Sequence, residues 1–284
     1  MKRRWSGLLF GLWLGIANAV YALPGDEIEV AIFPYLSVHQ LLELYEPLRH
    51  HLSEAYQRPV RLVTARDFPT FVADTHARSY PLLITAPHMA RLAEVDAGYH
   101  AVLRPEVTLY PIVVVAADSG IERLEQLAGH QVATPDAAAI ITLMGVELLG
   151  EAGLVVGEQV GLVAAGSHNN AIERLLRDPE VAAAIIANRA YGVVADRFAG
   201  RVERLPVDAR EAAIPPVVYL AGPHLSAEQR AELTERLLDF ANHSEAGQAM
   251  MARAHHEALR PFGEAERRWL DRLLPRVREA FAAP

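Results

Sequence analysis

Two short segments of this 284-residue sequence carry residue types suited to holding a small anion. They read Thr134-Pro135-Asp136-Ala137-Ala138-Ala139 and Gly166-Ser167-His168-Asn169-Asn170, and each follows a β-rich apolar run and precedes a helical pattern. Ser, Asn or Asp at such a junction caps the helix, whose first-turn N–H groups have no partner inside the helix. Two helix starts facing one crevice offer free donors and partial positive charge to an anion. The alternative is that both junctions are ordinary caps in an α/β sheet, which is the better interpretation of either junction alone.

The rest of the chain predicts the elements that position these segments. Helical patterns alternate with β-rich runs as far as residue 225, and from Ser226 to the end the pattern is helical only. The β-rich runs cover residues 28–33, 59–63, 81–84, 110–116, 131–133, 160–164, 181–187, 202–207 and 217–221. This alternation predicts βαβ units and a mainly parallel sheet. In such sheets the ligand crevice lies at the carboxyl ends of the strands, where Tyr35 and residues 85–88 fall.

The sequence predicts two lobes. Segments 107–113 and 207–217, the second rich in proline, are the expected crossings between them. Residues 23–110 and 215–284 then form lobe 1, and residues 111–214 form lobe 2. Two crossings make a hinge that can close on a ligand.

Residues 1–22 have the pattern of a secretory signal peptide. Basic residues 2–4 precede an apolar run at 8–17, and Ala17-Asn18-Ala19 or Val20-Tyr21-Ala22 provides a cleavage site. A retained membrane anchor is the alternative, although the run is short for a membrane span. The absence of cysteine excludes disulfides, Cys-based metal sites and a lipid anchor on a mature N-terminal Cys. We therefore expect a soluble periplasmic protein.

Composition and motifs disfavour several other functions. The net charge is −8, with no Lys/Arg cluster beyond the N-terminus, so nucleic acid and anionic membrane surfaces are poor partners. The pairs His50-His51 and His255-His256 are poor chelators, because adjacent helical residues face different directions. No nucleophile elbow, phosphate-binding loop or dinucleotide fingerprint is present. We expect no catalytic residue, no metal and no cofactor.

The order of these segments resembles the phosphate/phosphite/phosphonate-binding protein family, the periplasmic substrate-binding components of ABC importers. The matching words are FPY at 33–35, PLLITAP at 81–87, LEQLAGHQVA at 124–133 and AGSHNNAI at 165–172, and the resemblance covers essentially the whole mature chain. It implies a two-lobed type II periplasmic binding protein fold, α/β in class, that closes on a small oxyanion-like ligand of the phosphonate or phosphite class.

The resemblance also implies which residues face the ligand: Tyr35, Thr85, Ala86, His88, Ser167, His168 and Asn169, with Asn188 as a neighbour. The hydroxyl-rich anion loop of the family here reads DAAAIIT at 136–142, which places Ala138, Ala139 and Thr142 at the site. A hydrogen bond to a charged group contributes about 1.5–3 kcal/mol, so losing two hydroxyls weakens binding of a tetrahedral oxyanion by orders of magnitude. A less charged or partly apolar ligand fits equally well.

Four of these side chains also have structural interpretations. His168 can donate to an oxyanion from a ring nitrogen or cap its own helix. His88 is otherwise a solvent-facing histidine at a helix start. Thr85 is otherwise a helix cap, and Tyr35 a packing residue.

The sequence thus predicts a monomeric solute-binding protein that delivers a small molecule to an inner-membrane ABC permease without making or breaking bonds. A sensor of the same fold that signals to a histidine kinase is the alternative. An enzyme on this fold ranks last, because no nucleophile–base pair is visible.

Overall fold

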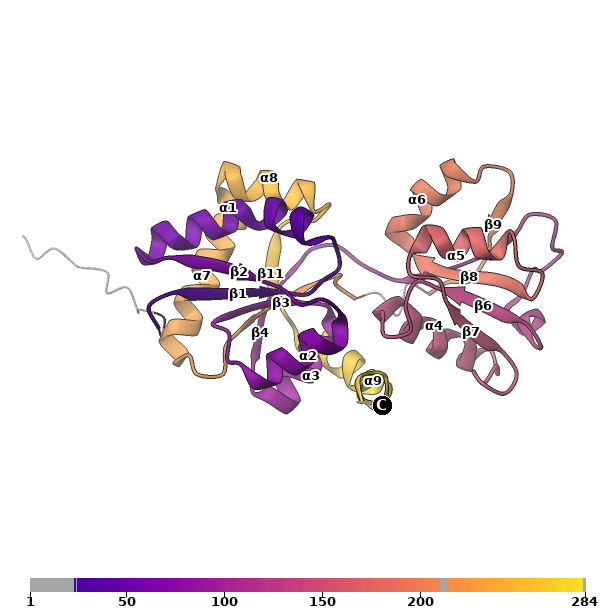
Figure 1. Ribbon diagram of the computed structural model, residues 1–284, viewed down its shortest axis with the longest axis horizontal. Helices are drawn as coiled ribbons and strands as arrows, with labels where there is room; N and C mark the ends of the chain where they lie inside the picture. Colours follow the sequence, from indigo (N-terminus) through magenta and orange to yellow (C-terminus); the bar gives the residue numbers. More distant parts are fainter. Residues whose placement is uncertain (1–22, 24, 210–213, 283–284) are drawn as a thin grey trace, which may run out of the picture.

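The computed structural model describes residues 23, 25–209 and 214–282, and Figure 1 shows two lobes joined by extended segments. Each lobe contains one sheet, with six strands in one and five in the other. The two-lobed α/β fold expected from the sequence is therefore confirmed. The predicted signal peptide at 1–22 lies outside the described residues.

Lobe 1 is built on a sheet with the strand order β11-β4-β10-β3-β1-β2. Its strands are β1 (Ile28–Ile32), β2 (Val60–Val63), β3 (Leu82–Thr85), β4 (His100–Pro105), β10 (Val218–Ala221) and β11 (Leu259–Pro261). Its helices are α1 (Val38–Tyr56), α2 (Phe68–Ala77), α3 (Pro87–Ala97), α7 (Ala227–His243), α8 (Glu245–Arg253) and α9 (Glu264–Phe281).

Lobe 2 is built on a sheet with the order β7-β6-β8-β5-β9. Its strands are β5 (Pro111–Ala116), β6 (Gln131–Thr134), β7 (Gly161–Ala164), β8 (Val181–Ala187) and β9 (Val202–Arg204). Its helices are the 3-10 helix η1 (Leu124–Leu127), α4 (Ile140–Glu151), α5 (His168–Leu175) and α6 (Asn188–Arg197).

Both sheets are mixed, which refines the expectation of mainly parallel sheets. β1 is parallel to β2 and β3, and β6 is parallel to β7 and β8. β10 is antiparallel to β3 and β4, and β5 is antiparallel to β8 and β9. The route of the chain explains this. β5 and β10 are the first strands after a crossing, and they begin where β8 and β3 end, with Pro111 opposite Ala187 and Val218 opposite Thr85.

Two strands were not predicted, β4 of six residues and β11 of three. β4 follows α3, and β11 pairs with β4 by only three residues, 259–261. The expectation that the chain is helical only after Ser226 was therefore wrong at β11. A strand of three residues is too short to show the period-two alternation that marks a half-buried strand.

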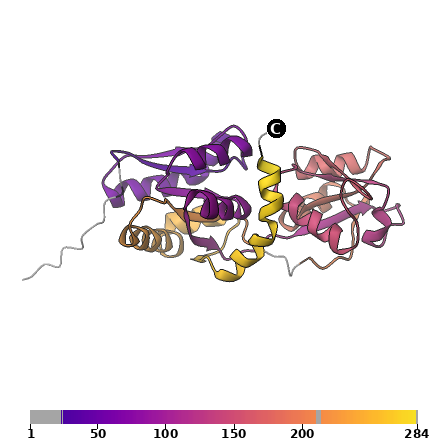
Figure 2. The same cartoon turned by 90° about the horizontal axis from the view of Figure 1, so that it is seen from below.

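The C-terminal helix α9 lies between the two lobes, as Figure 2 shows. It packs against α3 of lobe 1 and α4 of lobe 2, with Leu270, Leu273 and Val277 buried. Arg276 Nε of α9 lies 2.5 Å from Glu147 Oε1 of α4. One apolar core consequently extends from lobe 1 to the α4 side of the lobe 2 sheet, whereas the α5 side forms a separate cluster.

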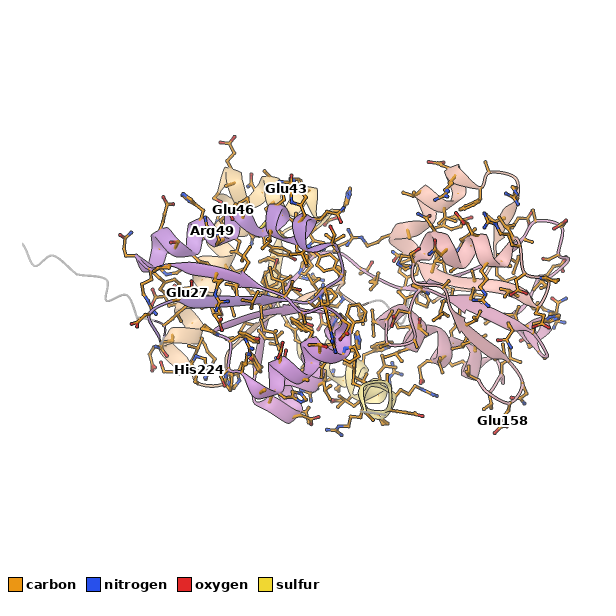
Figure 3. All side chains as sticks on the ribbon, viewed as in Figure 1. Glu27, Glu43, Glu46, Arg49, Glu158 and His224 are labelled. Atoms are coloured by element: carbon orange, nitrogen blue, oxygen red, sulfur yellow. The ribbon has the colours of Figure 1, made fainter. Side chains whose placement is uncertain are left out.

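The outer surface of lobe 1 carries paired charges. Figure 3 labels Glu43, Glu46 and Arg49 on α1. Arg49 pairs with Glu46 at 2.5 Å, and Glu43 pairs with Arg253 of α8 at 2.9 Å. Among the described residues, no helix has both the length and the apolar character needed to cross a membrane.

Candidate functional site

A cavity of about 530 Å³ lies between the lobes and is lined by residues of both. Lobe 1 contributes the segments that follow β1, β2 and β3, and lobe 2 contributes those that follow β6, β7 and β8. All six are carboxyl ends of strands. The cavity therefore occupies the position where open α/β sheets bind ligands, and it is large enough for a small organic molecule.

The two segments singled out from the sequence lie side by side in lobe 2. The backbone N–H of Ala165 donates to the carbonyl of Thr134 (2.8 Å), and that of Gly166 donates to the carbonyl of Pro135 (2.6 Å). Gly166 has a φ of +82°, a conformation in which glycine avoids strain. Both segments contribute residues to the cavity wall, so the two helix starts do face one crevice.

Three helices that begin at the cavity have no side-chain cap. The N-cap residues of α3, α4 and α6 are Ala86, Ala139 and Ala187, and all three line the cavity. Two other helices that begin at the cavity, α2 and α5, do have side-chain caps, Asp67 and Ser167.

An alanine N-cap provides no side-chain acceptor for the first-turn N–H groups, so those that are not bonded inside the protein can donate to a ligand. At the first helical position this leaves α4, because Pro87 of α3 has no N–H and the N–H of Asn188 in α6 donates to the carbonyl of Tyr110 (3.0 Å). The helix starts also bring partial positive charge to the cavity.

His168 begins α5 and lines the cavity. Its Nδ1 atom accepts a long hydrogen bond of 3.5 Å from the backbone N–H of Ala187, so the ring proton is assigned to Nε2. Burial lowers the pKa of His168, which favours the neutral ring. The helix is capped by Ser167, whose hydroxyl accepts from the N–H of Asn170 at 3.1 Å. The Nε2–H group of His168 is therefore available to a ligand oxygen.

His88 is almost completely buried and joins the lobes. It belongs to α3 of lobe 1, and its Nε2 lies 3.1 Å from the carbonyl oxygen of Ala138 in lobe 2. Burial lowers the pKa of His88 to about 4, so the ring is neutral at pH 7 and Nε2–H donates to the carbonyl. Nδ1 has no hydrogen-bond partner. The expected alternative, a solvent-facing histidine, is excluded by this burial.

Aromatic side chains form the lobe 1 wall of the cavity. The rings of Phe33 and Tyr35 stack with centroids 4.6 Å apart. The ring of Phe68, the first residue of α2, has its centroid 6.2 Å from that of Phe33. The Tyr35 hydroxyl lies 3.1 Å from that of Tyr45, which is buried in α1. Burial raises the pKa of both tyrosines, so they are neutral phenols. The hydrogen bond fixes how the Tyr35 ring is presented.

The charged side chains that line the cavity are two acids. Asp67 caps α2 by accepting from the N–H of Thr70 (2.7 Å), and Asp136 accepts from the N–H of Ala138 (2.8 Å). No Lys or Arg of the described chain lines the cavity. Arg189 of α6 lies nearby, but its guanidinium donates across the lobes to the carbonyls of Ala254 (3.0 Å) and His255 (2.8 Å).

The structure brings six of the predicted site residues to the cavity: Tyr35, Ala86, His88, Ala139, Ser167 and His168. The remaining five, Thr85, Ala138, Thr142, Asn169 and Asn188, are not part of its lining. The Thr142 hydroxyl donates to the carbonyl of Asp136 (2.6 Å), and the Thr85 hydroxyl contacts Met89 Sδ (3.7 Å). Asn188 bonds the crossing segment, accepting from Tyr110 N–H and donating to the Thr108 carbonyl. These polar groups are used inside the protein.

Sequence reasoning missed the apolar part of the wall. Phe33, Phe68, Met89, Leu109 and Pro216 line the cavity but carry no polar group that suggests a ligand. One signal was available. Phe68 follows a strand and an Asp N-cap, the same type of junction that drew attention to the lobe 2 segments.

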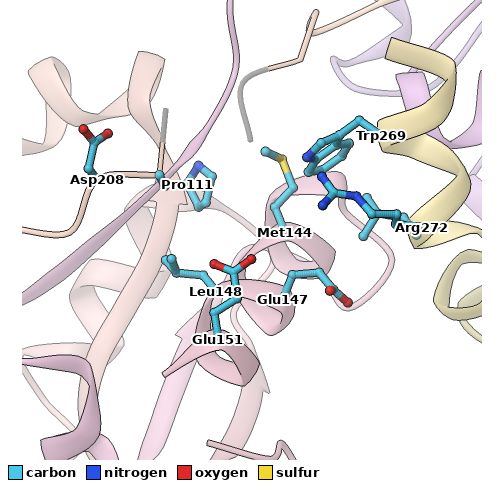
Figure 4. Close-up of a pocket in the computed structure, with 10 residues that line it drawn as sticks. Pro111, Met144, Glu147, Leu148, Glu151, Asp208, Trp269 and Arg272 are labelled. Carbon is cyan, nitrogen blue, oxygen red and sulfur yellow. The ribbon is translucent and has the colours of Figure 1, made fainter. Parts of the chain in front are cut away.

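A second, smaller cavity of about 180 Å³ lies between α4, α9 and the crossing segments (Figure 4). Glu147 and Glu151 of α4 face Trp269 and Arg272 of α9 there. The guanidinium of Arg272 lies 5.6 Å from the centre of the Trp269 ring. Within the described ranges, no three His, Cys, Asp or Glu side chains gather as a metal site.

The fold and the cavity together define a two-lobed ligand-binding protein, in which both lobes contribute strand ends to one cleft. The chain belongs to the family described as ABC transporter, phosphonate, periplasmic substrate-binding protein, whose model matches residues 30–268. Members of this family bind a small molecule for a membrane permease and are transport components, not enzymes. A comparison with curated proteins gives no significant match.

Solved structures support the fold. The chain is similar to XAC2383 from Xanthomonas citri bound to ATP, with 19% identity over 90% of this chain and 98% of that one, at a TM-score of 0.75. It is also similar to PhnD1 from Prochlorococcus marinus in complex with methylphosphonate, with 12% identity, 89% and 99% coverage and a TM-score of 0.72. The periplasmic aliphatic sulphonate binding protein SsuA from Escherichia coli has 17% identity, 92% and 94% coverage and a TM-score of 0.64.

Proposed function

We propose that this substrate-binding protein takes a small oxyanion-like ligand into the cleft between its lobes and presents it to an inner-membrane ABC permease. The observation that supports this ligand class is the set of helices α3, α4 and α6, which begin at the cavity with alanine N-caps. The Nε2–H group of His168 adds a neutral donor. Neutral donors and helix starts recognise an anion without a cationic side chain. Methylphosphonate, which is bound to PhnD1, and the aliphatic sulphonates for which SsuA is named belong to this class.

Closure about a hinge is the second part of the proposal. Leu109 and Ile214 pair across the two crossings, with N–H to carbonyl bonds of 2.7 and 3.0 Å. This pair lies at the proposed boundary between the lobes. Lobe 1 comprises residues 23–110 and 215–284, and lobe 2 comprises residues 111–214. A paired hinge holds the lobes in register while small backbone rotations change their separation. The protein is proposed to act as a monomer and to be exported to the periplasm by the signal peptide predicted at residues 1–22.

Binding measurements test the ligand class. The mature protein is titrated calorimetrically with phosphate, phosphite, methylphosphonate and ethanesulfonate, and its thermal unfolding is followed with each. A ligand present at 100 times its dissociation constant adds about 2.7 kcal/mol to the free energy of unfolding. Replacing His168 with Ala is expected to weaken the best ligand by roughly ten-fold or more, because it removes a donor to a charged group. An unchanged affinity would remove His168 from the site, and no binding by any of the anions would overturn the proposed class.

The sensor alternative makes a different prediction about the partner. A permease reconstituted with this protein is expected to hydrolyse ATP faster when ligand is added. A histidine kinase whose autophosphorylation responds to the liganded protein, with no effect on the permease, would favour sensing.

A further inference from the structure

We propose that the cleft selects singly charged organic anions with a flat apolar body, such as arylsulfonates, over small or doubly charged oxyanions. This inference rests on the proposed function and narrows its ligand class. Three features of the cavity lead to it: the aromatic wall in lobe 1, a lining whose described residues include no Lys or Arg, and a volume of about 530 Å³.

The aromatic wall is built to contact a ring. Phe33 stacks on Tyr35 at 4.6 Å with an angle of 19° between the ring planes, and Phe68 continues the wall at 6.2 Å. The hydrogen bond between the hydroxyls of Tyr35 and Tyr45 orients the Tyr35 ring before a ligand binds. Aromatic groups favour offset-stacked or edge-to-face neighbours, so this wall favours a planar apolar group over a methyl or an amine.

The charges of the lining oppose a second negative charge on the ligand. Asp67 and Asp136 are its charged side chains, His88 and His168 are neutral, and no Lys or Arg of the described chain lines it. Moving a doubly charged anion out of water requires compensation by opposite charge or many donors. In lobe 2, the starts of α4 and α6 and the Nε2–H group of His168 supply donors, which suits a single anionic head.

The same two carboxylates and the aromatic wall also raise the possibility of an organic cation, held by cation–π contacts. The arrangement of the helices decides against it. α3, α4, α5 and α6 all begin at the cavity, so their partial positive charges converge there and repel a cation. An anionic head in lobe 2 and an apolar body against lobe 1 satisfy both halves of the cavity.

Calorimetric titration with matched anions tests the apolar body. Benzenesulfonate and methanesulfonate carry the same head, and we expect the aromatic compound to bind roughly 30-fold more tightly, because burying a phenyl ring resembles burying a Phe side chain. The Phe68→Leu variant should reduce this ratio several-fold while still binding both compounds. Phe71→Leu is the control, since Phe71 lies on the same helix but is buried in the lobe 1 core. The control should lower thermal stability and leave the ratio unchanged.

A second pair tests the charge. At pH 8.5 phenylphosphonate carries two negative charges and benzenesulfonate carries one. We expect benzenesulfonate to bind at least ten-fold more tightly than phenylphosphonate. In the Asp136→Asn variant, the ratio of the two dissociation constants should be smaller. The asparagine can still accept from the Ala138 N–H, so the loop keeps its hydrogen bond.

The outcomes separate this inference from the broader proposal. Equal binding of the two sulfonates, tighter binding of inorganic phosphate, or tighter binding of benzyltrimethylammonium would each overturn the selectivity. If small oxyanions bind well and aromatic ones do not, the proposed oxyanion class stands and this inference fails. If no anion of either series binds, both fail.

Discussion

The two lobes arrange their strands in the same way but line the cleft with different material. The order β2-β1-β3-β10-β4 in lobe 1 corresponds to β7-β6-β8-β5-β9 in lobe 2, with the crossing strand in the same place in each. At the strand ends of lobe 1, the cavity is lined by the side chains of Phe33, Tyr35, Phe68 and His88. Lobe 2 presents short alanine-rich loops, where backbone N–H groups lie close to the cavity.

Because of this difference, we expect the two lobes to recognise different parts of a ligand. Side chains differ in shape, so a wall made of rings selects the body of a ligand. Backbone donors at helix starts are the same in every sequence, so they select charge and acceptor atoms. Each prediction below alters one lobe or one contact between the lobes. Apart from matched comparison variants, the predictions are ordered by the size of the expected effect.

Acid should destabilise the protein through His88, the buried histidine of lobe 1. Its folded pKa of about 4 lies below the ordinary value of 6.5, so the unfolded chain binds a proton first as pH falls. Stability is therefore retained above about pH 6.5 and lost between pH 6.5 and 4, by up to roughly 3 kcal/mol. Urea unfolding at several pH values measures this loss. The His88→Gln variant should show a smaller decline, with its stability at pH 7.5 controlling for packing. An equal decline would show that His88 is not the responsible group.

The bare helix start in lobe 2 is tested by giving α4 its own acceptor. Ala139 has an extended N-cap conformation (φ −67°, ψ 138°), so the Ala139→Asp variant can cap the helix. We expect anion affinity to fall at least about 100-fold, equivalent to 2.7 kcal/mol, while the free energy of unfolding rises by about 0.5–1 kcal/mol. Ala139→Asn supplies a neutral cap and should weaken binding less. Calorimetry and thermal unfolding measure the two effects, and a capped variant that binds normally would contradict the role of the helix start.

The lobe 2 segments were predictable because capping is local. Ser167 is a typical N-cap residue, so the start of α5 can be predicted from a few neighbouring residues. The structure places His168, the first residue of that helix, at the cavity. The lobe 1 wall depends on strand order, because Phe33 and Phe68 follow different strands and come together only when β1 and β2 pair. Two polar residues of the predicted site form hydrogen bonds inside the protein. Thr142 and Asn188 resemble ligand donors, but their hydrogen bonds are to the backbone, a choice that sequence alone does not reveal.

Asn188 provides a test of that distinction. Its side chain bonds Tyr110 N–H at 3.1 Å and the Thr108 carbonyl at 3.2 Å, and both partners lie on the crossing that precedes β5. The Asn188→Ala variant should lower the free energy of unfolding by about 1–2 kcal/mol, since two backbone groups lose their partner. Ligand affinity should change by less than about three-fold. A large loss of affinity with unchanged stability would restore Asn188 as a ligand-binding residue.

The smallest effect is expected for the ion pair between α9 and lobe 2. Arg276 and Glu147 form an ion pair at 2.5 Å, but both side chains are more than one-third exposed. Exposed pairs of this kind contribute little because water screens the charges and two long side chains lose freedom. The Arg276→Gln variant should therefore change the free energy of unfolding by less than about 0.5 kcal/mol.

Leu273 on the same helix gives the matched comparison, because it is buried in the core that the two lobes share. The Leu273→Ala variant should lower stability by about 2–5 kcal/mol through the lost apolar contacts and the cavity left behind. If α9 holds the lobes together by packing, small-angle scattering should then report a wider spread of lobe separations for Leu273→Ala than for Arg276→Gln. The reverse order would mean that the ion pair, and not the apolar contact, joins α9 to lobe 2.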